Sequence, residues 1–282
     1  MRKLILFFVG VGFHSILIAQ AGYQPPILGL SAYIPQNGKE LNMHDAFAFT
    51  GNQGSLGRTE KFSVAVYGEQ RFMIGEVKNI HLALCGPLGK GGLGFSASMF
   101  GTSEYGENGI GLAYGMRIGK HVDLGVQFNF NMMKIAMYGN ASAITYAVAA
   151  RVNLTSRLVA GLQMRNPAGG RFGEEKQEKF PTVFSFGLGY SPSSSFYVTC
   201  AVNRDEKKAV GARAAVQYRF HEKINAGVGC DTQASSPWIS LGYKLGRLWL
   251  EATASMHPQL GLSPGLKLNY SFGGSKKKEK EE

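Results

Sequence analysis

From residue 61 onward, apolar residues alternate with small or polar residues along most of the chain. This period of two is typical of β-strands, because successive side chains point to opposite faces of a sheet. The pattern predicts fourteen strands, most of them near the ~9–11 residues that cross a bilayer as a tilted strand. The predicted strands are 61–67, 77–85, 92–100, 109–118, 122–135, 143–154, 158–165, 182–190, 196–203, 208–220, 223–231, 238–245, 248–257 and 264–272.

The links between these strands alternate in length. The even-numbered links are short, with the sequences CGPLGKG, GK, TSR, SPSSS, HE and GR, whereas the odd-numbered links are mostly longer, above all the link from Asn166 to Pro181. Outer-membrane barrels have tight periplasmic turns and larger external loops, an asymmetry that a soluble β-sandwich has no reason to keep. We therefore predict an all-β fold, a closed antiparallel transmembrane β-barrel of about 14 strands over residues 61–272.

Charged side chains lie mostly on the small-residue face of the predicted strands. A Lys or Arg that faced lipid at the bilayer midplane would cost ~2–4 kcal/mol, so these side chains are expected to face the lumen. A soluble sheet with one wet face alternates in the same way, but here the opposite face is apolar on strand after strand. The candidate lumen-lining residues are Arg117, Arg151, Arg213, Arg219 and Glu251.

Tyrosines near the ends of the even-numbered strands predict an aromatic girdle at the membrane interface, where an apolar ring with a polar tip is favoured. These residues are Tyr114, Tyr190, Tyr218, Tyr243 and Tyr270.

The two ends of the chain differ from the barrel. Arg2 and Lys3 precede an apolar stretch, and Ala19-Gln20-Ala21 has the shape of a cleavage site, so residues 1–21 are predicted to be a signal peptide cleaved near residue 21. Residues 22–60 alternate little and are expected to form a plug-like segment in the periplasm or the lumen; a flexible periplasmic leader is the alternative. Residues 273–282 are predicted to be a charged periplasmic tail.

Composition and motifs narrow the chemistry. A hydrophobic content of 44% excludes a disordered chain. The Lys and Arg residues behind the net charge of +11 are dispersed along the strands of a chain that we expect to be exported, which argues against a nucleic-acid-binding protein. Residues 89–94 match G-x-G-x-x-G but precede a strand rather than a helix, so they predict a hairpin. Cys200 and Cys230 lie on apolar faces and are expected to act as small buried hydrophobes.

The histidines show no metal-ligand spacing, and the sequence contains no nucleophile elbow and no cofactor motif. We therefore expect no catalytic, metal or cofactor site and no enzymatic activity, with a barrel enzyme as the minor alternative.

The order of features resembles the FadL-like outer-membrane barrels, in particular the PorV/PorQ-type branch associated with type IX secretion. The shared features are an exported chain, a pre-barrel segment and fourteen strands. Local motifs include Asn166-Pro167-Ala168-Gly169 before a long loop and His257-Pro258-Gln259-Leu260-Gly261 before the last strand. The chain departs from the family at residues 51–56, where Gly-Asn-Gln-Gly-Ser-Leu replaces an Asn-Pro-Ala-Gly run.

The resemblance implies a conduit or docking component of the cell envelope or of a protein secretion machinery in the outer membrane. The alternative is an uptake channel for a small hydrophobic molecule, released sideways through a wall kink at strand glycines such as Gly187 and Gly189. The expected partners are outer-membrane lipid, secretion-machinery or other envelope proteins, and a small hydrophobic ligand. On either interpretation the lumen charges would hold the plug-like segment or bias the entry of solutes.

Overall fold

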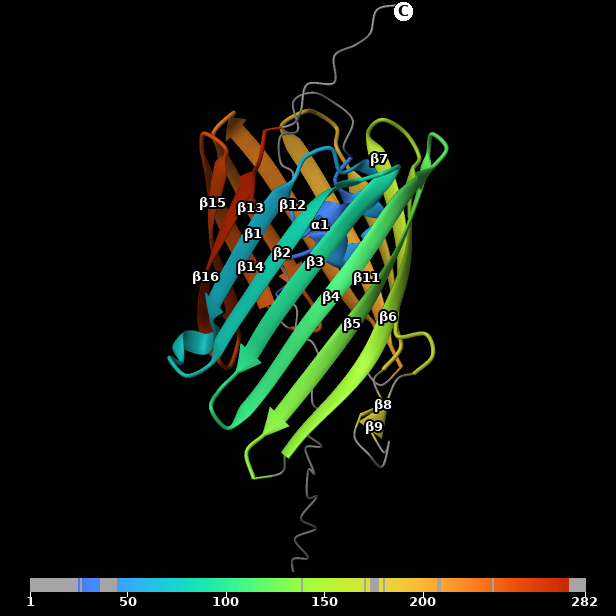
Figure 1. The fold of residues 1–282 in the computed structure, drawn as a ribbon. Helices are drawn as coiled ribbons and strands as arrows, with labels where there is room; N and C mark the ends of the chain where they lie inside the picture. Colours follow the sequence, from blue (N-terminus) through green and yellow to red (C-terminus); the bar gives the residue numbers. More distant parts are fainter. Residues whose placement is uncertain are drawn as a thin grey trace, which may run out of the picture.

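Fourteen long strands form a closed antiparallel barrel (Figure 1). The structure, a computed structural model, describes residues 25, 27–35, 45–137, 139–169, 171–172, 178–179, 181–206, 209–234 and 236–273. The barrel strands are β1 (Ser63–Gln70), β2 (Lys78–Leu88), β3 (Gly91–Gly101), β4 (Tyr105–Ile118), β5 (Val122–Ile135), β6 (Gly139–Asn153), β7 (Leu158–Arg165), β10 (Val183–Tyr190), β11 (Phe196–Asp205), β12 (Gly211–His221), β13 (Ile224–Asp231), β14 (Ser236–Leu245), β15 (Leu248–His257) and β16 (Gly261–Ser271). The all-β class and the strand number predicted from the alternation are confirmed.

Each barrel strand pairs with the barrel strands that precede and follow it in the chain, and β1 pairs with β16 to close the sheet. A closed sheet has no edge strand, so the strand backbone hydrogen-bonds within the wall, as a hydrocarbon surrounding demands. Among the barrel pairs, the register shifts only between β12 and β13, at Arg219 and His221. No helix among the described residues is long and apolar enough to span a bilayer.

The links differ from the expected alternation in length. β4 begins at Tyr105 rather than near residue 109, and β6 begins at Gly139, so two links that were predicted to be long contain mostly strand. Polar residues continue the β4–β5 ladder as far as Tyr105, opposite Ile135, because backbone pairing needs no apolar face where both faces are wet. The link after β7 does remain long, and it contains the short hairpin β8 (Arg171–Phe172) and β9 (Glu178–Lys179).

Side chains of the barrel wall alternate between a polar or small inner face and an apolar outer face. In β4, Ile110 and Leu112 point outward and are about half exposed, whereas Ala113 is buried. In β5, Phe128 is 61% exposed and its neighbour Gln127 is 7% exposed. The exposed set is apolar and the buried set carries the polar groups, which is the reverse of a soluble fold. This inversion places the outer face in lipid.

The outer face also carries the expected aromatic residues near the end of the barrel that holds the short links. Tyr190, Tyr218 and Tyr243 are each nearly half exposed. Tyr218 contacts Phe220 edge to face with ring centroids 4.8 Å apart, and Tyr270 contacts Phe272 in the same way at 4.9 Å. These rings mark the headgroup level at the end of the barrel with tight turns, which is the periplasmic end.

The cysteines lie differently from the expectation. Cys85 is buried, but Cys200 and Cys230 are exposed on the outer face. The interpretation of these two as buried residues is wrong, because the apolar face of a strand in this barrel points to lipid rather than to a core.

A substitution of Cys200 therefore tests whether this face of β11 points to lipid. We expect Cys200→Arg, in the middle of β11, to lower the free energy of unfolding by ~2–4 kcal/mol, because the charge enters hydrocarbon. Val210→Arg is the matched control: Val210 is 61% exposed but lies outside the strands, so it should cost only ~0–1 kcal/mol. Urea titration in phospholipid vesicles measures both. Equal losses at the two positions would contradict a lipid-facing β11.

The N-terminal segment, which is defined here as the described residues before β1, packs against the inner face of the wall. It contains η1 (Leu30–Tyr33), α1 (Ala48–Gly51) and η2 (Gln53–Arg58). Figure 1 shows α1 enclosed by the strands, nearer the end of the barrel at which β1 begins. Most of its apolar side chains are buried and form one cluster with inward residues of the wall. The predicted signal peptide (1–21) and most of the tail (273–282) lie outside the described residues.

Candidate functional site

The first charged cluster surrounds Asp123 on β5. Register places Asp123 opposite Arg117 of β4 on one side and opposite Arg151 of β6 on the other. Asp123 Oδ2 lies 2.7 Å from Arg58 Nε of the N-terminal segment and 3.2 Å from Arg151 Nη1. Arg117 is farther away, at 4.0 Å, with a side chain 43% exposed. One fully buried carboxylate thus faces three guanidinium groups, and one of these belongs to the N-terminal segment.

Arg151 extends the same cluster to η1. Its Nε donates to the carbonyl oxygen of Ala32 at 3.0 Å, and its Nη2 donates to that of Ile34 at 3.1 Å. The side chain has no exposed surface. Arg151 therefore connects the wall to the chain around η1, while Arg58 connects it to η2.

A second charged cluster lies on another part of the wall, at β15 and β16. Lys267 Nζ is 2.6 Å from Glu251 Oε2 on the neighbouring strand and 3.3 Å from Asp45 Oδ2 of the N-terminal segment. Ser31 also donates to Asp45 Oδ2, at 2.8 Å. A single buried cation is thus shared by one carboxylate of the wall and one of the N-terminal segment.

Neutral side chains add further contacts at the junction of α1 and η2. Asn52 Nδ2 donates to the carbonyl oxygens of Ala150 and Leu162 at 3.1 and 3.0 Å. Gln53 donates to Gln127 at 2.8 Å and accepts from Gln163 at 3.1 Å. The N-terminal segment is therefore hydrogen-bonded to β5, β6 and β7 as well as ion-paired to the wall.

Glycines of β7 and β10 make room for Tyr33. A Cβ atom at Gly187 would lie 2.3 Å from the Tyr33 ring, and one at Gly189 would lie 1.7 Å from the Tyr33 carbonyl oxygen. Both glycines pair in register on both sides, with β7 and with β11. These glycines thus allow close approach of the N-terminal segment, and the wall is continuous at the point where a sideways exit had been considered.

Burial raises the pKa of the Tyr33 phenol above its ordinary value, so the hydroxyl group stays protonated at neutral pH. It donates to the carbonyl oxygen of Gly51 at 3.2 Å and so links η1 to α1.

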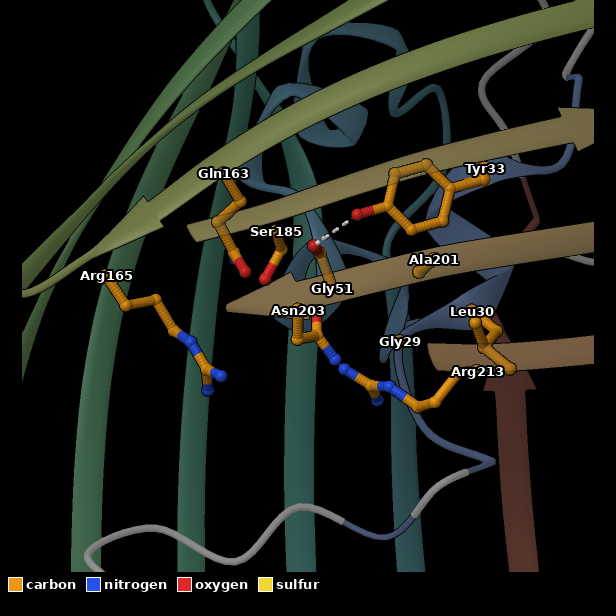
Figure 2. A pocket seen from close by; sticks show the side chains of 10 residues that line it. All are labelled: Gly29, Leu30, Tyr33, Gly51, Gln163, Arg165, Ser185, Ala201, Asn203 and Arg213. Atoms are coloured by element: carbon orange, nitrogen blue, oxygen red, sulfur yellow. Dashed lines mark hydrogen bonds between the residues drawn. The ribbon is translucent and has the colours of Figure 1, made fainter. Parts of the chain in front are cut away.

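A small pocket lies between the N-terminal segment and the strands β7, β10, β11 and β12 (Figure 2). Its volume is about 10 Å³, which is room for about one water molecule. The lining residues are Gly29, Leu30, Tyr33, Gly51, Gln163, Arg165, Ser185, Ala201, Asn203 and Arg213. The N-terminal segment supplies an apolar and aromatic surface, while the strands supply amide, hydroxyl and guanidinium groups.

Two guanidinium groups dominate the charge of this pocket. Arg213 lies 3.7 Å from Asp231, the residue opposite it on β13. With its amide oxygen turned toward Arg213, Asn203 also accepts hydrogen bonds from Arg213 Nη2 at 3.0 Å and from Arg213 Nε at 3.2 Å. The Nε atom of Arg165 is buried and has no hydrogen-bond partner among the described residues. Figure 2 shows both guanidinium groups at the same side of the pocket as Gln163, Ser185 and Asn203. The lining combines an apolar surface with donors for an acidic or polar group, but a molecule larger than water would fit only after the N-terminal segment moves.

The five candidate lumen residues do not form one site. Arg117 and Arg151 share Asp123, Glu251 belongs to the second cluster, and Arg213 lines the pocket. Arg219 lies over the ring of Tyr197, with Cζ 5.8 Å from the centroid.

Arg165 is not recognisable from the sequence as a pocket residue, because it is an ordinary charge near a strand end. Tyr33, Asn52 and Gln53 are not recognisable either, because the N-terminal segment has no periodicity. The run of strand glycines that accommodates Tyr33 was the available signal. No group of three His, Cys, Asp or Glu residues in the described ranges could hold a metal ion.

A closed cylinder with an apolar outer face, an aromatic girdle and a polar interior defines an outer-membrane β-barrel. No family model matches the chain, and no curated protein matches it. Among solved structures, the fold is similar to the toluene transporter TodX of Pseudomonas putida at 9% identity, with 89% of this chain and 98% of that chain covered and a TM-score of 0.57. A FadL homologue of Pseudomonas aeruginosa gives 9% identity, coverage of 87% and 98%, and a TM-score of 0.57.

The monoaromatic hydrocarbon channel CymD is similar at 10% identity, with 87% of this chain and 97% of that chain covered and a TM-score of 0.55. At these identities the likeness concerns the fold. It confirms the closed-barrel fold. Membership of the FadL-like barrels and the expected lack of enzymatic activity remain predictions. The PorV/PorQ-type branch and its link to type IX secretion remain predictions.

Proposed function

We propose that this protein is an outer-membrane channel for the uptake of a small, partly hydrophobic molecule. The observation that carries the proposal is the mixed lining between the N-terminal segment and β7 to β12. Leu30 and Tyr33 share there with Arg165 and Arg213 a small space that would widen when the N-terminal segment moves. The similar folds of TodX and CymD, which are named as a toluene transporter and a monoaromatic hydrocarbon channel, support the same class of cargo. The two arginines favour cargo that carries an acidic group.

Residues 22–60 would act as a plug in this channel. Support comes from the ion pairs of Arg58 with Asp123 and of Asp45 with Lys267, which hold the N-terminal segment against separate parts of the wall. Arg117, Arg151 and Glu251 would serve this plug, whereas Arg213 would bias the entry of solutes. Because the wall is paired at Gly187 and Gly189, passage would require movement of the plug rather than a gap between β7 and β10.

Docking to an envelope or secretion component remains the alternative function. It rests on the resemblance in sequence organisation, whereas the similar folds of TodX and CymD favour the channel.

Uptake of benzoate tests the channel. Liposomes that contain the barrel should take up benzoate several-fold faster than protein-free liposomes at neutral pH, and the R165Q/R213Q variant should lose most of this gain. Arg204→Gln is the control, because Arg204 is exposed and lies outside the pocket lining. Uptake no faster than in protein-free liposomes would refute the channel. Uptake that R165Q/R213Q leaves unchanged would refute the role of the two arginines.

A further inference from the structure

The tight turns at the periplasmic end carry a regular set of cations. The turns after β2, β4, β6, β12 and β14 each contain one Lys or Arg, and each of these five side chains is exposed. We call this set the basic rim; its members are Lys90, Lys120, Arg157, Lys223 and Arg247. The only acidic residue in these five turns is Glu222, and no member of the basic rim forms an ion pair with another residue that the structure describes.

The opposite end of the barrel has no such excess of cations. Within the described residues, the links at that end contain four acidic residues, Glu76, Glu104, Glu178 and Glu206, against three basic residues, Arg71, Arg171 and Lys179. The positive charge of the turns is therefore concentrated at one mouth, and it does not follow simply from the net charge of the chain. The electrostatic potential is therefore more positive at the mouth that carries the basic rim than at the other mouth.

The distribution of the basic rim around the circumference indicates the kind of partner. Its members are spaced by two strands through most of the closed strand order, with interruptions at the turn between β10 and β11 and at the β1–β16 closure. A globular protein that docked from one side would contact a part of such a ring. The lipid layer that surrounds the barrel contacts all of it.

The depth of the basic rim fits the same partner. Tyr218 and Tyr243 lie on the outer face a few residues before Lys223 and Arg247, and the aromatic rings occupy the headgroup level. The cations therefore lie just beyond the aromatic girdle, where flexible Lys and Arg side chains reach phosphate groups. Each cation near an anionic lipid surface adds to the attraction.

We infer that the basic rim binds anionic phospholipid headgroups, such as phosphatidylglycerol, in the leaflet that faces the periplasm. The interaction is non-covalent and requires no movement of the N-terminal segment. It is independent of the channel proposal, because the basic rim shares no residue with the pocket.

Native mass spectrometry with equal amounts of phosphatidylglycerol and phosphatidylcholine tests this inference. The wild-type barrel should retain phosphatidylglycerol at least about fivefold over phosphatidylcholine, given the attraction expected for several cations at an anionic surface. The variant K90Q/K120Q/R157Q/K223Q/R247Q should lose this preference. Single variants such as R157Q should lose part of it, and they keep the test informative if the quintuple variant fails to migrate as a folded barrel.

The control variant K78Q/K134Q removes two exposed cations near the other mouth and should leave the preference unchanged. Equal retention of the two lipids by the wild type, or an equal loss in the control, would overturn the inference. Binding of an acidic polypeptide such as polyglutamate through the basic rim, without any lipid preference, would assign these residues to a protein partner and would also overturn it.

Discussion

Gly189→Ala is expected to displace the N-terminal segment from β7 and β10. The new methyl group would lie 1.7 Å from the Tyr33 carbonyl oxygen and 2.6 Å from its carbon. These are backbone atoms, so no side-chain rotation can relieve the overlap, and η1 has to move. Overpacking of this kind costs ~1–3 kcal/mol. In planar bilayers we expect the single-channel conductance to rise several-fold, and in hydrogen exchange we expect residues 27–35 to lose protection.

Gly68→Ala provides the matched control. Gly68 is also a strand glycine, but a Cβ atom there would meet nothing within 4 Å. The control variant should keep the conductance and the exchange protection of the parent protein. If Gly189→Ala behaves like Gly68→Ala in both measurements, the close packing of Tyr33 against the wall does not control the position of the N-terminal segment.

Asp123→Asn is expected to have the largest effect on stability. Asp123 is the carboxylate for Arg58 and Arg151, and its side chain and that of Arg151 have no exposed surface. Its neutralisation leaves the Arg151 guanidinium buried without a counter-charge, which costs ~3–5 kcal/mol in comparable buried pairs. Urea unfolding in detergent, followed by heat-modified migration on gels, measures the loss.

A double-mutant cycle separates the ion pair from general damage to the wall. Arg151→Met in the Asp123→Asn background removes the stranded cation and should recover part of the lost stability. Asp231→Asn is the control for loss of a less buried ion pair. The side chains of Arg213 and Asp231 are 15% and 12% exposed, and their charged atoms lie 3.7 Å apart. A variant Asp123→Asn as stable as Asp231→Asn would show that the cluster does not hold the N-terminal segment.

The wall of the barrel is predictable because one rule governs it. A strand between lipid and a polar lumen must alternate, and β12 does so, with Ala212, Ala214, Tyr218 and Phe220 exposed on the outer face. The rule weakens beyond the membrane, where both faces are wet. For this reason the start of β4 at Tyr105 was missed.

The interior is less predictable because its contacts join residues that no local pattern relates. The sequence pattern places Arg117, Arg151 and Glu251 on inward faces, but it does not indicate that Arg151 meets the carbonyl groups of Ala32 and Ile34. The partners come from a segment without periodicity, whose path depends on shape. The glycines show the same limit, since Gly187 was interpreted as a site of wall flexibility and is instead a surface for Tyr33.

The contact between the N-terminal segment and the last strand has a consequence for biogenesis. The amide of Ala46 donates to Asn269 Oδ1 at 3.1 Å across a sequence separation of 223 residues, and Lys267 meets Asp45 across 222. Contacts between residues so far apart in the sequence carry a loop-closure cost before they are made. The N-terminal segment therefore cannot complete its docking before β16 is in place, and seam closure between β1 and β16 requires the same strand.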